Sequence, residues 1–293
     1  MTSDLSKKVE TAIGRIKAFE PQEGYEIGFS GGKDSCVVDA LAKMAGVKFI
    51  KRYRVTSVDP PELVQFIKEQ HTDAIREVPR YPDGSPITMW NLIPKKLMPP
   101  TRIVRYCCDK LKESAGIGKL TITGVRWAES FNRANSQGAI TVYNPSAEMK
   151  NDPNFHLTNK GGVVLNNDND ESRKLVEQCY QKRKTVLNPI IDWTDDDVWE
   201  FIRAEKIPVC GLYYEGMHRL GCIGCPMAGV HGREKEFLRW PKYKEMYIRS
   251  FEKMNNVRIE RGMKTGWTTG QDVFNWWMQY DVLPGQYEFD DLL

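Results

Sequence analysis

Apolar and polar positions along the first 130 residues predict strands and helices in turn. Helical spacing of apolar residues predicts a helix over residues 5–19, and the apolar run 25–29 predicts a strand that ends at a Ser-Gly-Gly turn. From residue 34 the apolar spacing is helical again. A strand, a glycine turn and a helix in this order begin a βαβ unit.

The same alternation continues beyond this unit. We expect further strands over 47–55, 75–78 and 120–123, and helices over 60–70 and 106–114. The proline-rich segment 81–100 is predicted to be irregular. Because parallel strands need such crossover helices, the sequence predicts an α/β fold with a Rossmann-like, doubly wound parallel sheet.

The second half of the chain is less regular. Residues 134–183 are rich in Asn, Asp and Gly without periodicity, which indicates an insertion, either a hairpin or a loop. A strand is expected near 185–190, and then a helix to residue 204 with Thr194 as its N-cap. From 232 onward the pattern is helical, with an aromatic face that we interpret as core packing. We therefore predict an α/β domain over 1–230 and a helical C-terminal extension over 231–293.

Composition narrows the class of protein. The chain has 293 residues, of which 41% are hydrophobic, so a substantial core can form. The net charge of +3 is too small to argue for nucleic-acid binding by itself. No run of 18 apolar residues predicts a membrane span, and no secretory signal is visible, so we expect a cytoplasmic protein. In such a chain the seven cysteines are metal ligands, nucleophiles or core residues rather than disulfides.

One glycine-rich loop between a predicted strand and a predicted helix has the chemistry of a phosphate site. Its glycines allow a sharp turn, and the following helix contributes the positive end of its dipole. A lysine adds a full charge, and two serine hydroxyls can donate to phosphate oxygens. The spacing is neither that of a Walker A loop nor G-x-G-x-x-G. The loop consists of Ser30, Gly31, Gly32, Lys33, Asp34 and Ser35.

A second segment, over residues 124–133, follows another predicted strand. Arg126 and Arg133 could both reach an anion, because guanidinium groups match phosphate and sulfate oxygens. Glu129 could orient one of them. From two arginines alone, a surface network of ion pairs is the simpler interpretation.

Five of the cysteines are candidate metal ligands. Cys107 and Cys108 are adjacent, and Cys222 and Cys225 form a C-x-x-C on a glycine-bearing turn. Two such pairs supply the four thiolates of a zinc site or of a [4Fe–4S] cluster. Neighbouring side chains diverge, which suits the larger cluster better than a single zinc ion. Cys210 lies in the same cysteine-rich segment, 207–226, and is the fifth candidate.

These motifs together resemble one family. The string SGGKDS resembles the pyrophosphate loop of the adenine nucleotide α-hydrolase superfamily. Residues 124–133 resemble the G-x-R-x-x-E-S-x-x-R segment of the phosphoadenylyl-sulfate reductase family, and the CC plus C-x-x-C set resembles the cluster cysteines of adenylyl-sulfate reductases. The element 58–63, with Asp59, also resembles the family, whereas 56–59 is closer to its divergent phage and genomic-island members.

The resemblance implies an ATP pyrophosphatase that adenylates an acceptor for sulfur transfer. Lys33, Asp34 and Arg126 would be catalytic, with Mg²⁺ bridging phosphate oxygens. The implied partners are an adenine nucleotide, a sulfur donor such as a cysteine desulfurase, a nucleic-acid acceptor and a second copy in a homodimer. The nucleotide would be held by Ser30, Gly31, Gly32, Lys33, Asp34, Ser35, Asp59, Gly124, Arg126, Glu129 and Arg133.

Several alternatives remain open. Divergent members of the superfamily, such as the ATP pyrophosphatase subunit of DNA phosphorothioation systems, resemble this chain in their C-terminal cysteines, which makes Cys108, Cys210, Cys222 and Cys225 a competing ligand set. Sulfonucleotide reductases, which act on adenylyl or phosphoadenylyl sulfate, use a cysteine near the C-terminus. The last cysteine here is Cys225, so a reductase would have to use Cys107 or Cys210 with thioredoxin. The third alternative is a catalytically silent nucleotide sensor in a phage or defence assembly.

Overall fold

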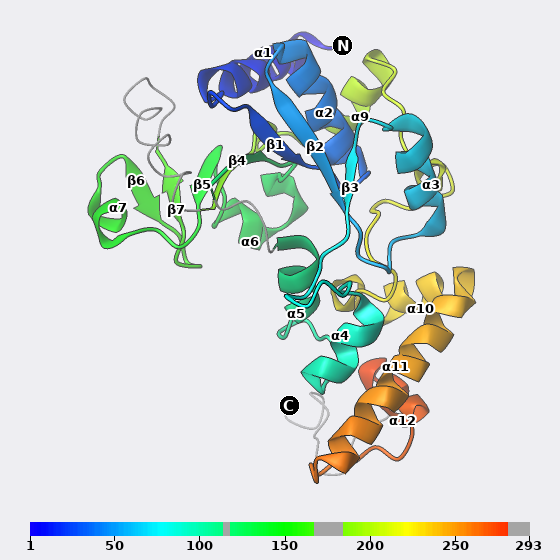
Figure 1. Cartoon of the computed structure of the whole chain (residues 1–293). Coiled ribbons are helices and arrows are strands. Elements are labelled where there is room, and N and C mark those ends of the chain that lie inside the picture. Colours follow the sequence, from blue (N-terminus) through cyan, green and yellow to red (C-terminus); the bar gives the residue numbers. More distant parts are fainter. Residues whose placement is uncertain (114–117, 167–183, 281–293) are drawn as a thin grey trace, which may run out of the picture. The chain divides into compact units, whose positions relative to one another are not determined.

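The computed structural model describes residues 1–113, 118–166 and 184–280 (Figure 1). The chain divides into two compact units. The first, called the sheet unit, comprises Met1–Tyr53, Glu62–Glu77 and Ala115–Leu220. The second, called the helical unit, comprises Arg54–Pro61, Val78–Ser114 and Gly221–Leu293. The segment after residue 220 thus groups with two short segments from the first half of the chain.

A mixed sheet forms the centre of the sheet unit, with the strand order β3-β2-β1-β4-β8-β5-β7-β6. Strands β2, β1, β4 and β8 run parallel, whereas β5, β7 and β6 pair antiparallel. The predicted α/β class is confirmed, with a parallel half that contains the predicted βαβ start. The strands are β1 (Tyr25–Gly28), β2 (Phe49–Arg54), β3 (Ile75–Glu77), β4 (Leu120–Ile122), β5 (Ile140–Val142), β6 (Phe155–Leu157), β7 (Val163–Leu165) and β8 (Thr185–Leu187).

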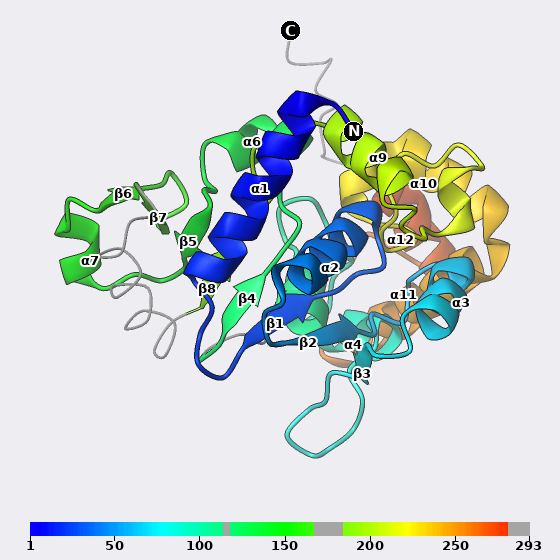
Figure 2. The same ribbon diagram turned by 90° about the horizontal axis from the view of Figure 1, so that it is seen from above.

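Helices α1 (Ser3–Ala18) and α2 (Lys33–Ala45) lie over the parallel strands, as seen from above in Figure 2. The Thr2 hydroxyl caps α1 by accepting from the Leu5 N–H. Both helices bury apolar faces in the core that also includes Ile27 and Ile122 from the strands. Helix α3 (Pro61–Gln70) lies between β2 and β3 in the chain, and α9 (Asp195–Ala204) follows β8, with Thr194 as its N-cap as predicted.

The segment expected to be an insertion extends the sheet. Its described part forms β5, helix α7 (Ala147–Asn151), β6 and β7. Strands β6 and β7 form an antiparallel pair in which Phe155 faces Leu165, so the hairpin interpretation is the right one for these residues. Residues 167–183, including Cys179, lie outside the described part of the chain.

The helical unit contains α4 (Met89–Lys96), α5 (Tyr106–Cys108), a π-helical turn (Asp109–Glu113), α10 (Gly229–Arg239), α11 (Pro241–Glu260) and α12 (Gly270–Trp277). The expectation of an irregular segment over 81–100 is wrong at α4. A capping box between Thr88 and Asn91 starts this helix, and its apolar face packs on α11. This packing outweighs the backbone hydrogen bond lost at Pro94.

The aromatic face predicted for the C-terminal helices is a core. Phe237, Trp240 and Tyr247 are buried, and the ring of Trp277 packs on Tyr247 with centroids 4.9 Å apart. Tyr243 is half-buried, and its hydroxyl donates to the Asp59 carbonyl at 3.1 Å. No helix in the described part of the chain is both long and apolar enough to cross a bilayer.

Candidate functional site

The glycine-rich loop joins β1 to α2, and its conformation requires glycine at position 31. Gly31 has φ +73°, and a Cβ there would lie 2.7 Å from the Ile67 Cδ1 of α3. Gly32 is the N-cap of α2, and its carbonyl accepts from the Ser35 hydroxyl at 2.8 Å. The loop therefore packs closely on α3 while the first turn of α2 is held in register, which is the geometry of an anion site at a helix N-terminus.

The exit of β4 approaches this first turn directly. A Cβ on Gly124 would lie 2.8 Å from both the carbonyl carbon and oxygen of Asp34. Both of these Asp34 atoms belong to the backbone and not to a flexible side chain. A side chain at position 124 would therefore displace the Asp34 backbone. Gly124 thus lets the exit of β4 lie against the first turn of α2.

Four charged side chains form one network at this point. Lys33 Nζ lies 3.1 Å from Asp34 Oδ2 and 3.2 Å from Asp195 Oδ1. Arg126 donates from Nε to Asp34 Oδ1 at 2.7 Å and from Nη2 to Asp195 Oδ1 at 2.7 Å. Its Nη1 donates to the Trp193 carbonyl at 3.2 Å, so the guanidinium, which is 1% exposed, is fixed on three sides.

The Asp195 carboxylate of this network is held ionised. Partial burial opposes ionisation of Asp195, but Lys33 and Arg126 hold the pKa of its carboxyl below the ordinary value. Asp34 and Asp195 each contact both Lys33 and Arg126. The positive charges of these two side chains are therefore oriented before any ligand binds.

Arg133 adds a further positive group beside the network. It forms an ion pair with Glu129, whose other contact is the Arg126 backbone N–H at 3.0 Å. Burial lowers the pKa of the Arg133 guanidinium, and the nearby positive charge of Arg219 lowers it further, whereas Asp34 acts in the opposite direction. Two neighbouring guanidinium groups repel each other unless an anion lies between them, so this arrangement favours a bound anion.

Three residues of this region were missed at the sequence level. Asp195 was interpreted only as a favourable charge in the first turn of a helix. Tyr213 accepts the Lys33 N–H at its hydroxyl oxygen at 2.8 Å, and Arg219 lies beside Arg133. None of the three forms a motif with its sequence neighbours, and only the run of three acids at 195–197 could have drawn attention.

Asp59 lies in the helical unit, whereas the loop lies in the sheet unit. Its carboxylate accepts the Thr56 N–H at 3.4 Å, and its charge raises the pKa of both Lys112 and Cys222. Asp59 is therefore part of the surroundings of the cysteines, and its assignment to the nucleotide stays a prediction.

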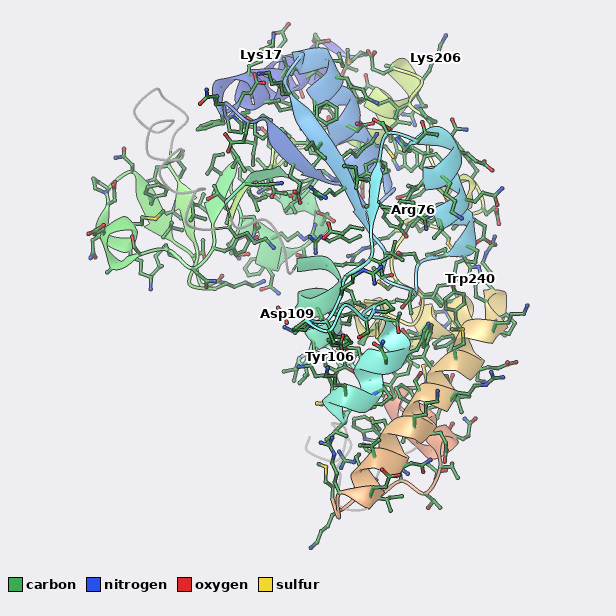
Figure 3. The ribbon with its side chains drawn as sticks, in the orientation of Figure 1. Lys17, Arg76, Tyr106, Asp109, Lys206 and Trp240 are labelled. Carbon is green, nitrogen blue, oxygen red and sulfur yellow. The ribbon has the colours of Figure 1, made fainter. Side chains whose placement is uncertain are left out.

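Four of the five candidate cysteines lie in the helical unit and influence one another. The charges of Cys108, Cys222 and Cys225 all raise the pKa of Cys107, whose thiol donates to Cys108. That hydrogen bond lowers the pKa of the Cys108 thiol to about 6, and the Arg105 guanidinium, 3.2 Å from its sulfur, adds to the effect. Figure 3 labels Tyr106 and Asp109, which flank this pair.

Cys210 is placed differently. It is buried in the sheet unit, where its charge would act on Cys36 and on Tyr213. Cys36 itself is buried, and burial together with Asp39 raises the pKa of its thiol to about 12, as expected for the core residue that the sequence indicated.

The turn that carries Cys222 and Cys225 is firmly anchored. Gly224 N–H donates to Glu236 Oε2 at 2.7 Å, and Tyr247 donates to the Ile223 carbonyl at 3.0 Å. Ile223 N–H in turn donates to the Val58 carbonyl at 2.8 Å. Gly224 has φ +73°, and a Cβ there would lie 2.8 Å from an aromatic carbon of Tyr247, so glycine is required.

The candidate cysteines of the helical unit are four thiols that lie near one lysine. Within the described residues, no group of three or more His, Cys, Asp and Glu side chains is arranged to hold one metal ion. Cysteines that bind different iron atoms of a cubane lie further apart than those around one zinc ion. Lys112 supplies a cation at the Cys222 sulfur, whose negative charge raises the pKa of the lysine. The assignment of these cysteines as metal or cluster ligands stays a prediction.

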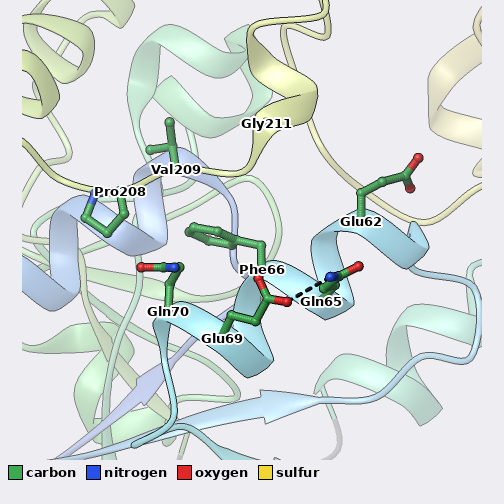
Figure 4. Close-up of a pocket in the computed structure, with 8 residues that line it drawn as sticks. All are labelled: Glu62, Gln65, Phe66, Glu69, Gln70, Pro208, Val209 and Gly211. Atoms are coloured by element: carbon green, nitrogen blue, oxygen red, sulfur yellow. Dashed lines mark hydrogen bonds between the residues drawn. The ribbon is translucent and has the colours of Figure 1, made fainter.

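A separate hollow of about 440 Å³ lies between α3 and the segment before Tyr213 (Figure 4). It contains none of the residues of the loop or of the arginine segment, so the charge network and not this hollow defines the candidate site. Its lining consists of Glu62, Gln65, Phe66, Glu69, Gln70, Pro208, Val209 and Gly211.

The parallel half of the sheet, with a glycine-rich loop at its first crossover, is the arrangement of nucleotide-binding α/β enzymes. The chain matches the phosphoadenosine phosphosulfate reductase domain family over residues 25–228 and belongs to that family. This match covers β1 to the C-x-x-C, and so includes the loop, the arginine segment and all candidate cysteines.

Individual relatives are more distant. The chain is 25% identical over 266 residues to an uncharacterised protein of Methanocaldococcus jannaschii, covering 84% of this chain and 46% of that one. It is 35% identical to the adenosine 5'-phosphosulfate reductase of Allochromatium vinosum over 54 residues, 18% of this chain and 21% of the reductase. The FMN adenylyltransferase of Candida glabrata, solved with FMN and an ATP analogue, has a TM-score of 0.41 at 14% identity over 76% of this chain and 67% of that one. The chain spans less than half the length of these two sequence relatives.

Proposed function

We propose that this protein is an ATP pyrophosphatase that adenylates an acceptor for sulfur transfer. The observation that carries the proposal is the network of Lys33, Asp34, Arg126 and Asp195 at the N-terminus of α2. An anion that binds there meets a helix dipole, a buried lysine and an oriented guanidinium in one place. Phosphoryl chemistry depends mainly on such positioning and charge stabilisation.

In the proposed reaction the loop holds the β- and γ-phosphates of ATP. An oxygen of the acceptor attacks the α-phosphorus, a new P–O bond forms, and the bond to the bridging oxygen breaks, so that pyrophosphate leaves. Lys33 and Arg126 stabilise the charge that develops on the leaving oxygen. Asp34 and Asp195 keep both cations oriented, and their carboxylates are the candidates to bind Mg²⁺ together with the phosphates.

The helical unit would supply the second half of the chemistry. We propose that Cys107, Cys108, Cys222 and Cys225 bind a [4Fe–4S] cluster, with Lys112 beside Cys222. When bound, such a cluster can order the site or carry sulfur. Cys210 is less favoured as a ligand because it is buried beside Cys36 in the sheet unit.

Sulfonucleotide reduction is the second candidate, supported by the family match and by the adenosine 5'-phosphosulfate reductases among the relatives. That reaction needs a thiolate that can attack sulfur. Each cysteine in the described part of the chain is buried or half-buried, and the four in the helical unit are the proposed ligands. The described residues thus offer no exposed thiol for this role, which favours ATP cleavage.

The test incubates anaerobically purified protein with Mg²⁺-ATP and, separately, with phosphoadenylyl sulfate and reduced thioredoxin. We expect AMP or an adenylated product with stoichiometric pyrophosphate from the first reaction and no sulfite from the second. Lys33→Ala should abolish pyrophosphate release, whereas Lys17→Ala, an exposed lysine of α1, should not change it. Sulfite without pyrophosphate would overturn the proposal in favour of the reductase. ATP binding without turnover in the presence of candidate acceptors would favour a silent nucleotide sensor.

A further inference from the structure

The surface next to the arginine network carries exposed aromatic side chains. Phe131 is 83% exposed and Trp127 is 42% exposed. Both lie in the segment formed by the 3-10 turn η2 (Trp127–Glu129) and the short helix α6 (Phe131–Ala134), which also carries Arg133. Large apolar side chains are costly in water, so two of them beside a cationic centre need an explanation beyond packing.

Hydrogen bonds hold this surface in a defined shape. Trp127 Nε1 donates to the Gln137 carbonyl at 2.8 Å, and the Tyr143 hydroxyl donates to Gln137 Oε1 at 3.0 Å. Ser130 caps α6 by accepting from the Arg133 N–H. The indole is therefore held in place by its Nε1 hydrogen bond while the residue stays 42% exposed, as a stacking platform requires.

The positive groups of the surface are continuous with the nucleotide loop. Arg133 interacts electrostatically with Asp34 and Arg126 on one side and with Arg219 and Tyr143 on the other. Arg219 is exposed, and its charge is close enough to lower the pKa of the Arg133 guanidinium. A molecule that fills this surface would be anionic, would offer flat rings, and would reach the α-phosphate of a bound ATP.

We propose that Trp127, Phe131, Arg133 and Arg219 bind single-stranded nucleic acid, which is the acceptor of the adenylyl group. Unpaired bases stack on exposed aromatic rings, and their phosphates pair with neighbouring arginines. A duplex does not fit this chemistry because its bases are already stacked. Two separate rings and two guanidinium groups offer more contacts than one mononucleotide uses. Single-stranded nucleic acid would be the substrate class of the proposed function. Its role as the acceptor rests on that function.

The test measures fluorescence anisotropy of fluorescein-labelled single-stranded DNA and RNA 20-mers, without ATP, over a range of salt concentrations. Stacking on one ring contributes about 1–3 kcal/mol, so Phe131→Ala should weaken binding about 5- to 150-fold, while Phe131→Trp should retain it. Arg219→Ala should weaken binding and reduce the salt dependence by about one phosphate contact. Leu157→Ala, a 57% exposed leucine of β6, and Lys17→Ala are the matched controls and should bind like the wild type.

Wild-type affinity in both Phe131→Ala and Arg219→Ala would overturn the proposal. Equal competition by AMP would overturn it in favour of a mononucleotide site, and preferred binding of a duplex would contradict the stacking argument. If neither oligonucleotide binds but a protein partner is lost in Phe131→Ala, the surface is a protein interface and the proposal is wrong. Because ATP is absent, a failed pyrophosphatase assay leaves this result unaffected, and the two proposals fail separately.

Discussion

Arg126 donates a hydrogen bond from Nε to Asp34 Oδ1 at 2.7 Å, and this pair joins the exit of β4 to the first turn of α2. The same guanidinium reaches Asp195 at the start of α9, so one side chain connects the segments that follow β1, β4 and β8. Strands β4 and β8 are parallel neighbours, and their carboxyl ends therefore meet at the same edge of the sheet. Arg126 is thus placed by the sheet and oriented by two carboxylates.

Replacing Arg126 by lysine should test this orientation. Lysine keeps the charge but cannot make the forked contacts to Asp34 and Asp195, so we expect pyrophosphate release to fall by about 100-fold or more. Thermal unfolding, measured alongside, separates this effect from loss of fold. Arg203→Lys, an exposed arginine of α9, is the control. Activity within threefold of wild type would show that the fork is dispensable.

The close approach at Gly124 gives a steric prediction. Gly124→Ala places a methyl group 2.8 Å from the Asp34 carbonyl, so the first turn of α2 must shift and ATP affinity should drop at least tenfold in calorimetry. The control is Gly14→Ala in α1, where a new Cβ meets nothing within 4 Å. That substitution should stabilise the helix by about 0.5–1 kcal/mol. Unchanged ATP binding in Gly124→Ala would mean that the segment moves freely away from the loop.

A buried ion network behind the loop predicts a pH dependence. Lys51, 2% exposed, lies 2.9 Å from both Asp39 and Asp73. Burial alone would raise the pKa of Asp39, but hydrogen bonds from His71, Lys51 and Lys43 hold it well below the ordinary value of 3.8. A carboxyl with a lowered pKa stabilises the fold fully above the unfolded value and loses this contribution as the pH falls below it.

We therefore expect Asp39→Asn to lower the free energy of unfolding by about 3–5 kcal/mol at pH 7, because the buried Lys51 loses its buried carboxylate and keeps only the half-exposed Asp73. Between pH 4 and pH 2 the variant should lose less further stability than the wild type. Urea unfolding across this range, followed by circular dichroism, measures both effects. The exposed Asp4→Asn in α1 is the control. If the free energy of unfolding falls equally with pH in Asp39→Asn and in the wild type, the lowered pKa of Asp39 is not the source of the pH dependence.

The anchor of the cysteine turn predicts a requirement for Glu236. Glu236→Ala removes the acceptor 2.7 Å from Gly224 N, so the turn that presents Cys222 and Cys225 should loosen and hold less iron per chain. Glu236→Gln keeps an acceptor oxygen, so this variant should retain most of the iron. Iron analysis and visible absorbance after anaerobic purification are the measurements, with the exposed Lys235→Ala as control. A wild type without iron would overturn the cluster itself, whereas equal iron in Glu236→Ala would remove only the anchoring role.

Local patterns determined the first half of the fold. The strand over 25–28, the turn at Gly31 and the helix from Lys33 follow from a short apolar run, a residue that tolerates positive φ and helical spacing. These signals are complete within about 20 residues, so no distant contact was needed to interpret them. Helix α4 was missed because proline content suggested a loop, while its stability comes from packing on α11, about 150 residues away in sequence.

The sequence by itself identified the segments that can carry chemistry. These are the glycine-rich loop, the arginine segment, and the C-x-x-C together with two adjacent cysteines. Only the tertiary structure decided which distant residues join them. Asp195 reaches Arg126 because β8 lies beside β4, and Tyr213 reaches the loop through a hydrogen bond that leaves no periodic signal. It also placed Cys210 with Cys36 in the sheet unit and the other four cysteines in the helical unit. Spacing along a chain records local geometry, whereas strand order and crossovers determine which charges and thiols meet.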